Sequence, residues 1–462
     1  MKLWDGKRVL IIGAARQGLA LTRYFTKCGA DVTLNDRRTS EELINVINEN
    51  TDLPVKWVLG SHPLDLLHNT DLVCISGGVP TDLAIVKEAL ARTLTVTNDS
   101  QVFMKEVPCP VVGITGSAGK TTTTALLGDI ARIHFKESKQ VWVGGNIGIP
   151  LIDKLDLISP NDLVILELSS FQLELMTKMP QVGAILNITP NHLDRHKTLE
   201  AYRNAKARLL IHQTKNDIAI LGTDDQGAWS LVDQVKGKLI RFGENKPAQE
   251  SPGTYMQDNK IFITDGFNTY EIMPVKEIQL PGKHNLQNIM AACACAYAVG
   301  ILPESMREGI VKFAGVSHRL EFVSNINGVK WYNDSIATAP ERTIAAINSF
   351  NEPLVVLLGG RDKDLPWGEL AELIHQRVDH IIAFGEAAPI VQKALTNIQK
   401  NGKNLTVDLC EGLEEAVKKA HAIAQPGDVV LLSPGGTSFD EFDDFEKRGE
   451  SYRRWVKELT QT

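Results

Sequence analysis

The chain has 462 residues, of which 43% are hydrophobic, and its 49 basic and 56 acidic side chains give a net charge of −7. At roughly 150 residues per domain this length predicts about three domains, each with enough apolar residues for its own core. The composition excludes a disordered or collagen-like chain, and the sequence has no lysine- or arginine-rich stripe for nucleic-acid binding. We expect a monomer that acts on small molecules and binds no nucleic acid.

The chain lacks the patterns typical of secretion and membrane insertion. The apolar run at residues 9–12 is too short for the core of a signal peptide. The run at residues 289–302 is shorter than the roughly 20 residues that span a bilayer, and Pro303 closes it, so it indicates a buried helix. Six cysteines lie without metal-type or disulfide-type spacing. We therefore expect a reduced, cytoplasmic protein with no membrane span.

Short runs of valine, isoleucine and leucine alternate with helical stretches throughout. They are apolar at successive positions, which is typical of parallel strands covered on both faces. The expected strands are residues 8–12, 31–35, 72–76, 111–115, 163–168, 184–188, 354–358 and 429–433. The sequence predicts an α/β fold.

Two boundaries divide this predicted fold into three domains. One is the Pro108-Cys109-Pro110 kink before a strand, and the other lies near residues 315–319, after the helix at 289–302. We expect Rossmann-like domains at residues 1–107 and 317–462, and a central P-loop domain with a parallel sheet at residues 108–316. Within the central domain, polar and alternating residues at 236–279 predict a small antiparallel excursion.

A phosphate loop is expected after the strand at 111–115. A helix through residue 130 follows the run Gly116-Ser117-Ala118-Gly119-Lys120-Thr121-Thr122-Thr123. A glycine loop at a helix N-terminus directs backbone N–H groups and the positive end of the helix dipole at phosphates, while Lys120 can reach terminal phosphates and Thr121 can bind magnesium. Ile114 occupies the position where the first glycine of the usual motif is expected.

Acidic and basic side chains follow the next two predicted strands. Glu167 lies in an otherwise apolar strand, at the edge where α/β sheets bind ligands, and is a candidate magnesium ligand, although it could instead cap the next helix. His192, Asp194, Arg195 and His196 crowd into the loop after residue 188. Such a loop suits a second metal or a phosphate, or is simply solvated.

Lys206 falls in the apolar stripe of the helix predicted at residues 199–212. At 100° per residue it lies at 340°, between Tyr202 at 300° and Leu210 at 20°, counted from Leu199. A lysine there can extend its ammonium group to water. Burial would instead depress its pKa and favour the neutral amine, which reacts with carbon dioxide to give a carbamate, an oxygen ligand for magnesium.

Glycine-rich turns also follow strands in the outer domains. Residues 13–18 resemble a dinucleotide fingerprint with Ala15 in place of its second glycine, so nicotinamide binding is an alternative for the first domain. Asp36, Arg37 and residues 76–80 extend the same sheet edge. In the last domain, residues 359–363 and 433–438 suit a small anion such as a carboxylate, or serve only as turns.

Taken together, these motifs resemble the Mur ligase family, and within it the members that add D-glutamate. The matching segments run in the family's order through nearly the whole chain. They are residues 113–122, 144–148, 167–174, 192–195, 204–206, 282–288, 318–319, 333–335 and 433–445. The run Glu167-Leu-Ser-Ser-Phe-Gln-Leu-Glu174 is the most specific, whereas the phosphate loop is shared with folylpolyglutamate synthase.

The resemblance implies an ATP-dependent ligase of peptidoglycan precursor synthesis. The three domains would bind the UDP substrate, ATP and the amino acid, and D-glutamate would be joined to UDP-N-acetylmuramoyl-L-alanine through an acyl phosphate. Catalytic roles would fall to Lys120, Glu167, His192 and Lys206, with two magnesium ions held by Thr121, Glu167, His192 and carbamylated Lys206. Beside residues 116–123, the ATP contacts would be Asn288, Arg319 and Asp334. Substrate contacts would be Asp36, Arg37, Asn146, Thr338, Lys363, Ser438 and Phe445.

One position departs from the family pattern. Family members usually read Asp-Ser-Lys-Ala-Thr where this chain has Asp334-Ser335-Ile336-Ala337-Thr338, so a positive charge near the reacting phosphate or the amino acid is missing. ATP handling should be intact, whereas the identity of the amino acid stays open between D- and L-glutamate. The motifs also leave open a folylpolyglutamate synthase-like ligase and a nucleotide-binding module without ligase activity.

Overall fold

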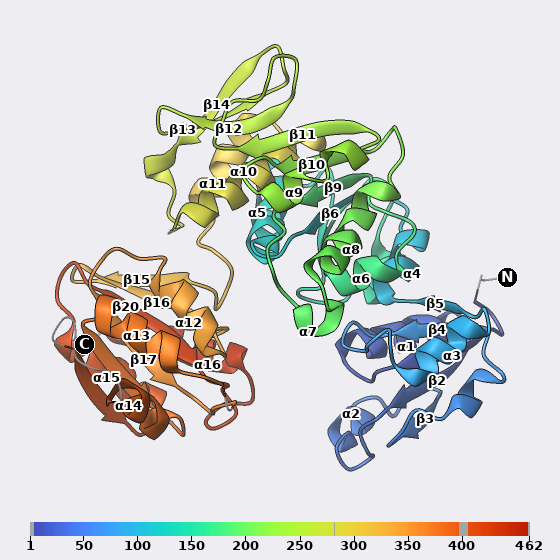
Figure 1. Cartoon of the computed structure of the whole chain (residues 1–462), viewed down its shortest axis with the longest axis horizontal. Coiled ribbons are helices and arrows are strands. Elements are labelled where there is room, and N and C mark those ends of the chain that lie inside the picture. The colour runs from blue at the N-terminus through green and yellow to red at the C-terminus, as the bar shows by residue number, and fades with distance from the viewer. Residues whose placement is uncertain (1–3, 281, 364, 397–404, 461–462) are drawn as a thin grey trace. The chain divides into compact units, whose positions relative to one another are not determined.

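The structure is a computed structural model that describes residues 4–280, 282–363, 365–396 and 405–460. It divides into two compact units (Figure 1). The first comprises Met1–Ile278 and Leu286–Lys312, and the second Gln279–Asn285 and Phe313–Thr462. The α/β fold expected from the sequence is confirmed.

The first unit begins with a parallel sheet in the order β3-β2-β1-β4-β5. Its strands are β1 (Arg8–Ile12), β2 (Asp31–Asp36), β3 (Val55–Leu59), β4 (Leu72–Ile75) and β5 (Thr95–Thr97). Its helices are α1 (Arg16–Lys27), α2 (Ile44–Asn48), η1 (Leu64–Leu67), α3 (Ala84–Ala91) and α4 (Asp99–Glu106). Val9 and Ile11 enter one buried cluster, and Leu10 and Ile12 another, because successive residues of a strand point to opposite faces.

The same unit contains a larger sheet in the order β14-β13-β12-β11-β10-β9-β6-β8-β7. The strands are β6 (Val111–Thr115), β7 (Val141–Gly145), β8 (Leu163–Glu167), β9 (Val182–Ile185), β10 (Ile218–Gly222), β11 (Lys238–Gly243), β12 (Gly253–Gln257), β13 (Lys260–Thr264) and β14 (Thr269–Pro274). The helices are α5 (Lys120–Phe135), η2 (Leu151–Leu157), α6 (Ser170–Leu175), α7 (Leu193–His196), α8 (Leu199–Ile211), α9 (Gln226–Trp229), η3 (Val232–Gln234), η4 (Val275–Glu277), α10 (Lys283–Ala298) and α11 (Pro303–Lys312).

The antiparallel excursion is confirmed for the β12–β13 and β13–β14 pairs only. β11 pairs in parallel with both β10 and β12, so it belongs to the parallel part of the sheet, and β12 joins the two parts. Figure 1 shows these strands at one end of the large sheet. The sequence did not reveal this because pairing direction depends on the partner strand rather than on local alternation.

Two other boundaries differ from expectation. The strand predicted at residues 184–188 is β9, which ends at Ile185, because the following backbone bonds to the phosphate loop instead of a neighbouring strand: Ser117 N donates to Asn187 O at 3.0 Å. The helix predicted at 289–302 is α10, which ends at Ala298, and residues 289–296 are fully buried as expected. No helix in the described part of the chain has the length and apolarity to cross a bilayer.

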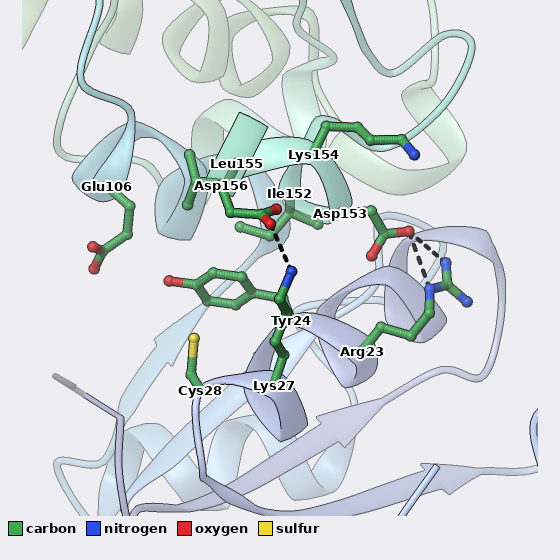
Figure 2. A pocket seen from close by; sticks show the side chains of 10 residues that line it. All are labelled: Arg23, Tyr24, Lys27, Cys28, Glu106, Ile152, Asp153, Lys154, Leu155 and Asp156. Carbon is green, nitrogen blue, oxygen red and sulfur yellow. Dashed lines mark hydrogen bonds and ion pairs between the residues drawn. The ribbon is translucent and has the colours of Figure 1, made fainter. Parts of the chain in front are cut away.

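Two ion pairs join α1 to η2, and so the first sheet's layer to that of the large sheet. Arg23 pairs with Asp153 at 2.6 Å, and Lys27 with Asp156 at 2.6 Å (Figure 2). They border a pocket of about 590 Å³ that Tyr24 and nine other residues line. Residues of both layers share one buried cluster, which places the two sheets in one unit, and these pairs lie at its border.

The second unit is built on a sheet in the order β15-β16-β20-β17-β18-β19, in which only the β15–β16 pair is antiparallel. Its strands are β15 (Glu321–Ile326), β16 (Val329–Asn333), β17 (Leu354–Gly359), β18 (His380–Phe384), β19 (Thr406–Cys410) and β20 (Val429–Gly435). The helices α12 (Pro340–Ile347), α13 (Gly368–Arg377), α14 (Ala388–Thr396), α15 (Leu413–Ile423) and α16 (Phe445–Glu458) complete it. Val356 and Leu357 enter buried clusters on opposite faces.

Candidate active site

The phosphate loop has the expected strand–loop–helix form. β6 ends at Thr115 and α5 begins at Lys120, with Gly119 between them in the left-handed region at φ +83°. A Cβ at Gly119 would lie 2.1 Å from Asn288 Oδ1, so only glycine fits there, and Asn288 of α10 lies against the loop. The Lys120 ammonium group folds back to Gly116 O at 2.8 Å and Ser117 O at 3.2 Å.

The rest of the loop is held by Asn187, a residue that sequence reasoning missed. Its side chain accepts from Ala118 N at 2.8 Å and donates to Ala118 O at 3.1 Å. Thr123 is fully buried in α5, and Thr122 is nearly so. Asn187 follows a buried strand at the edge where ligands bind, and that position was the signal that could have found it.

Glu167 lies beside the N-terminus of α5. It is the last residue of β8 and is buried; Thr121 Oγ1 donates to its Oε2 at 2.8 Å and Asn146 Nδ2 to its Oε1 at 2.9 Å. β8 and β6 are neighbouring parallel strands, so their carboxyl ends bring Glu167 and the phosphate loop to one edge. A hydroxyl and a carboxylate oxygen this close are ligands of the kind that magnesium prefers. The pair therefore fits the expected magnesium ion.

Lys206 is buried against the same loop, which settles the choice between a snorkelling and a buried lysine. Only 1% of it is exposed, and its Nζ donates to Gly116 O at 2.9 Å and Thr115 Oγ1 at 3.3 Å while lying 4.6 Å from the Tyr202 ring centroid. Burial, together with the nearby Lys120 charge, lowers the pKa of Lys206 well below that of a free lysine, against the opposing effect of Glu167. The neutral amine needed for a carbamate is thus favoured.

The two histidines of the 189–196 loop differ in their surroundings. His192 is exposed and its ring lies 5.2 Å from that of Phe171 and 6.3 Å from that of Tyr202. His196 is buried, stacks on Phe171 at 5.1 Å, and bonds Ser170 Oγ at 2.9 Å and Glu174 at 3.1 Å. His192 therefore keeps access to solvent next to α6 and α8, whereas His196 holds the loop in place.

Asp36 is not paired with Arg37, its neighbour in the expected UDP site. Asp36 accepts from Ala14 N at 2.7 Å and from Arg38 Nη2 at 2.8 Å, whereas Arg37 is exposed. Burial raises the pKa of Asp36, but the hydrogen bonds from Arg38 and Ala14 outweigh it and lower the pKa to about 2. Arg38 is a second residue that the sequence motifs did not reveal.

The predicted ATP and amino-acid contacts of the last domain all lie in the second unit. Buried Asp334 accepts from Ser433 Oγ at 2.9 Å and Leu320 N at 3.1 Å, and burial raises its pKa to about 7. Lys363 Nζ donates to Thr338 Oγ1 at 3.4 Å. Of the other predicted contacts, Arg319 and Phe445 are partly buried and Ser438 is buried.

The pocket of Figure 2 contains none of the predicted site residues. Within the described ranges, no three His, Cys, Asp or Glu side chains form a metal-binding group. Any metal at the phosphate loop would thus rely on mixed ligands such as the Thr121 and Glu167 oxygens.

Three family models match the chain in order. They are the Mur ligase MurD-like, N-terminal domain at residues 7–98, the Mur ligase middle domain at 114–296 and the Mur ligase, glutamate ligase domain at 318–436. The chain belongs to the Mur ligase family, a class of three-domain ligases.

Similar proteins indicate which kind of Mur ligase the chain resembles. UDP-N-acetylmuramoylalanine--D-glutamate ligase of Ruminiclostridium cellulolyticum is 38% identical over 98% of this chain and 97% of its own, and the enzyme of the same name from Acetivibrio thermocellus is 36% identical over 98% and 97%.

Solved structures agree at the level of the fold. UDP-N-acetylmuramate-alanine ligase MurC from Thermotoga maritima aligns at TM-score 0.56 and 19% identity over 98% of this chain and 99% of that one. MurF ligase from the same organism, in complex with ADP, aligns at TM-score 0.55 and 18% identity over 99% and 96%.

Proposed function

We propose that this protein is an ATP-dependent ligase that joins D-glutamate to UDP-N-acetylmuramoyl-L-alanine in the synthesis of peptidoglycan precursors. The observation that carries the proposal is the convergence of Lys120, Lys206 and the Thr121–Glu167 pair on one phosphate loop, in a chain whose full-length relatives bear that enzyme's name. A plain nucleotide-binding module has no need of a buried lysine with a lowered pKa beside such a loop.

The chemistry begins with transfer of the γ-phosphoryl group of ATP to the carboxylate of the UDP substrate, which gives an acyl phosphate. Positioning and charge neutralisation carry such transfers. Lys120 would leave its two loop carbonyls and contact the terminal phosphates. The amine of glutamate, which gives up a proton before or during the attack, then attacks the activated carbonyl. The C–N bond forms, the C–O bond to phosphate breaks, and inorganic phosphate leaves.

Thr121 and Glu167 would hold one magnesium ion, and His192 with carbamylated Lys206 a second. Such ions supply charge neutralisation and orientation of the phosphate oxygens when bound. Thr121 and Glu167 are already in contact at 2.8 Å, and Lys206 has the depressed pKa that carbamylation requires. Asn146, which contacts Glu167, would position the carboxylate and meet the UDP substrate.

The three-domain division at residues 1–107, 108–316 and 317–462 follows as part of this proposal. It is supported by the ranges of the three family models and by the division of the compact units at residue 312. Asp36 and Arg37 would meet the UDP substrate, whereas Thr338, Lys363, Ser438 and Phe445 would meet glutamate. Since ATP and UDP-linked sugars are cytoplasmic metabolites, we propose a cytoplasmic location.

The test is phosphate release from ATP with UDP-N-acetylmuramoyl-L-alanine as acceptor and D-glutamate, L-glutamate or a diamino acid offered in parallel. We expect release with D-glutamate, and its loss in Lys120→Ala but not in the exposed control Lys215→Ala. Phosphate release only with L-glutamate would assign the enzyme to L-glutamate instead, an outcome left open by the isoleucine at position 336. No release with any of the three would overturn the proposal.

A further inference from the structure

Two cationic side chains contact the turn that joins β16 to α12, residues 334–338. Arg342, in the first turn of α12, donates from Nη1 to Ile336 O at 3.2 Å. Lys363, in the turn after β17, donates to Thr338 Oγ1 at 3.4 Å. All three segments belong to the second unit, so these contacts do not depend on how the units are arranged.

Neither cation forms an ion pair with a described residue. Arg361, close to Lys363 in sequence, is different, because Glu386 binds its guanidinium group through both carboxylate oxygens at 2.8 and 2.9 Å. The acid of the turn itself is Asp334, and burial raises its pKa to about 7 against the opposing charges of Arg319 and Arg342. Arg342 and Lys363 are both exposed, so their charges are accessible to an anionic ligand at this turn.

A third cation lies behind the same turn. Arg448 is fully buried, and its guanidinium group donates to Ser335 Oγ at 3.0 Å, Ser335 O at 2.9 Å, Gly436 O at 3.1 Å and Thr437 O at 3.0 Å. All four acceptors are neutral. This buried charge adds positive potential beside the turn, because the low polarisability of the interior strengthens its effect, although the charges of Asp440 and Glu441 oppose it in part.

Position 336 itself contributes no charge to this turn, because its side chain is a half-buried isoleucine. Its carbonyl, however, is the atom that fixes the Arg342 guanidinium group. A glutamate ligand carries two carboxylates, and carboxylates pair best with guanidinium groups in a bidentate manner. One lysine at the turn would leave the second carboxylate without a cation.

We propose that Arg342 is a substrate-binding residue for glutamate, that it holds one carboxylate while Lys363 holds the other, and that it takes the place of the cation absent from position 336. This inference rests on the proposed function, since it names how that reaction's amino acid is bound. Arg448 acts as a positioning residue, because it ties the 334–338 turn to the turn after β20.

The experiment is steady-state kinetics of the full chain, with glutamate varied at saturating ATP and UDP substrate. In Arg342→Ala we expect KM for glutamate to rise about 10- to 100-fold, the usual effect of losing one hydrogen bond to a charged group, with KM for ATP unchanged. Arg342→Lys should lie between. Arg454→Ala, which removes an exposed guanidinium group from the same unit, is the matched control and should keep the KM of the unchanged protein.

A rescue variant separates binding from a structural role. Adding Ile336→Lys to Arg342→Ala should restore most of the glutamate affinity if the missing element is a cation, but not if Arg342 only braces the turn. An unchanged KM for glutamate in Arg342→Ala, or a rise in KM for ATP of the same size, would overturn the inference. Failure of the proposed function is distinguished from this outcome, because it would abolish turnover in the unchanged protein.

Discussion

Replacement of Lys206 by methionine is the sharpest test of the site at the phosphate loop. Methionine has similar length and no amine, so the change removes the group that would carry the carbamate while filling the same space. Lys206 lies in α8 with 1% of its surface exposed, so an apolar side chain of similar size suits its surroundings.

The cost to stability can be worked from its contacts. Two hydrogen bonds are lost, to Gly116 O at 2.9 Å and to Thr115 Oγ1 at 3.3 Å, and each is worth about 1 kcal/mol net. Gly116 O keeps Lys120 as a donor at 2.8 Å, and the apolar replacement avoids the burial of an amine. We expect the free energy of unfolding to fall by no more than about 2 kcal/mol.

The cost to activity should be much larger. If the amine carries a carbamate that helps to hold magnesium, its removal takes away preorganised charge at the transferring phosphoryl group, an effect of about 10²- to 10³-fold on kcat. The assay is the initial rate of phosphate release together with a thermal melt. Added short carboxylic acids should restore part of the rate, because they can occupy the space of the carbamate oxygens.

Tyr202→Phe is the matched control, since it removes the hydroxyl that donates to Ser117 Oγ at 3.1 Å one turn earlier in α8. It should lower activity less, and carboxylic acids should not restore it. Full activity of Lys206→Met, or a loss that no carboxylic acid relieves in a chain of unchanged stability, would refute the carbamate reasoning.

Three further predictions concern stability. Gly18→Ala should destabilise the chain by about 1–3 kcal/mol in urea unfolding, because the new Cβ would lie 1.8 Å from Gly13 O. Gly78→Ala is the control and should cost less, because its Cβ would meet nothing within 4 Å. Equal effects of the two variants would contradict this reasoning. Burial raises the pKa of Asp334 to about 7, so the folded state keeps a proton that the unfolded state releases near pH 4. The free energy of unfolding should therefore fall as pH rises from about 4 to 7, and Asp334→Asn should remove that part of the pH dependence. An unchanged pH profile in Asp334→Asn would contradict this. Arg23→Ala should lower the free energy of unfolding by less than about 1 kcal/mol in thermal melts, because the Arg23 side chain is 41% exposed and water screens its pair with Asp153 (Figure 2). A loss of several kcal/mol would show instead that the packing of α1 against η2 depends on this pair.

Local sequence determined most of the strands and the phosphate loop. Runs that are apolar at successive positions became β1, β6, β17 and β20 within one or two residues of expectation, because a strand buried on both faces has no other pattern available. The loop at residues 116–119 and the position of Lys206 on the apolar stripe of α8 also followed from spacing alone.

Tertiary structure decided what those elements meet. The sequence alone did not show that the Asp36 carboxylate accepts a hydrogen bond from Arg38 and not from Arg37. It also did not show that β9 ends at Ile185 and that the Asn187 side chain then hydrogen-bonds Ala118. Nor could it show that Arg342 and Lys363 would contact one turn. A hydrogen bond between residues distant along the chain depends on strand order and backbone direction, and these are set by packing of the whole domain rather than by any local pattern.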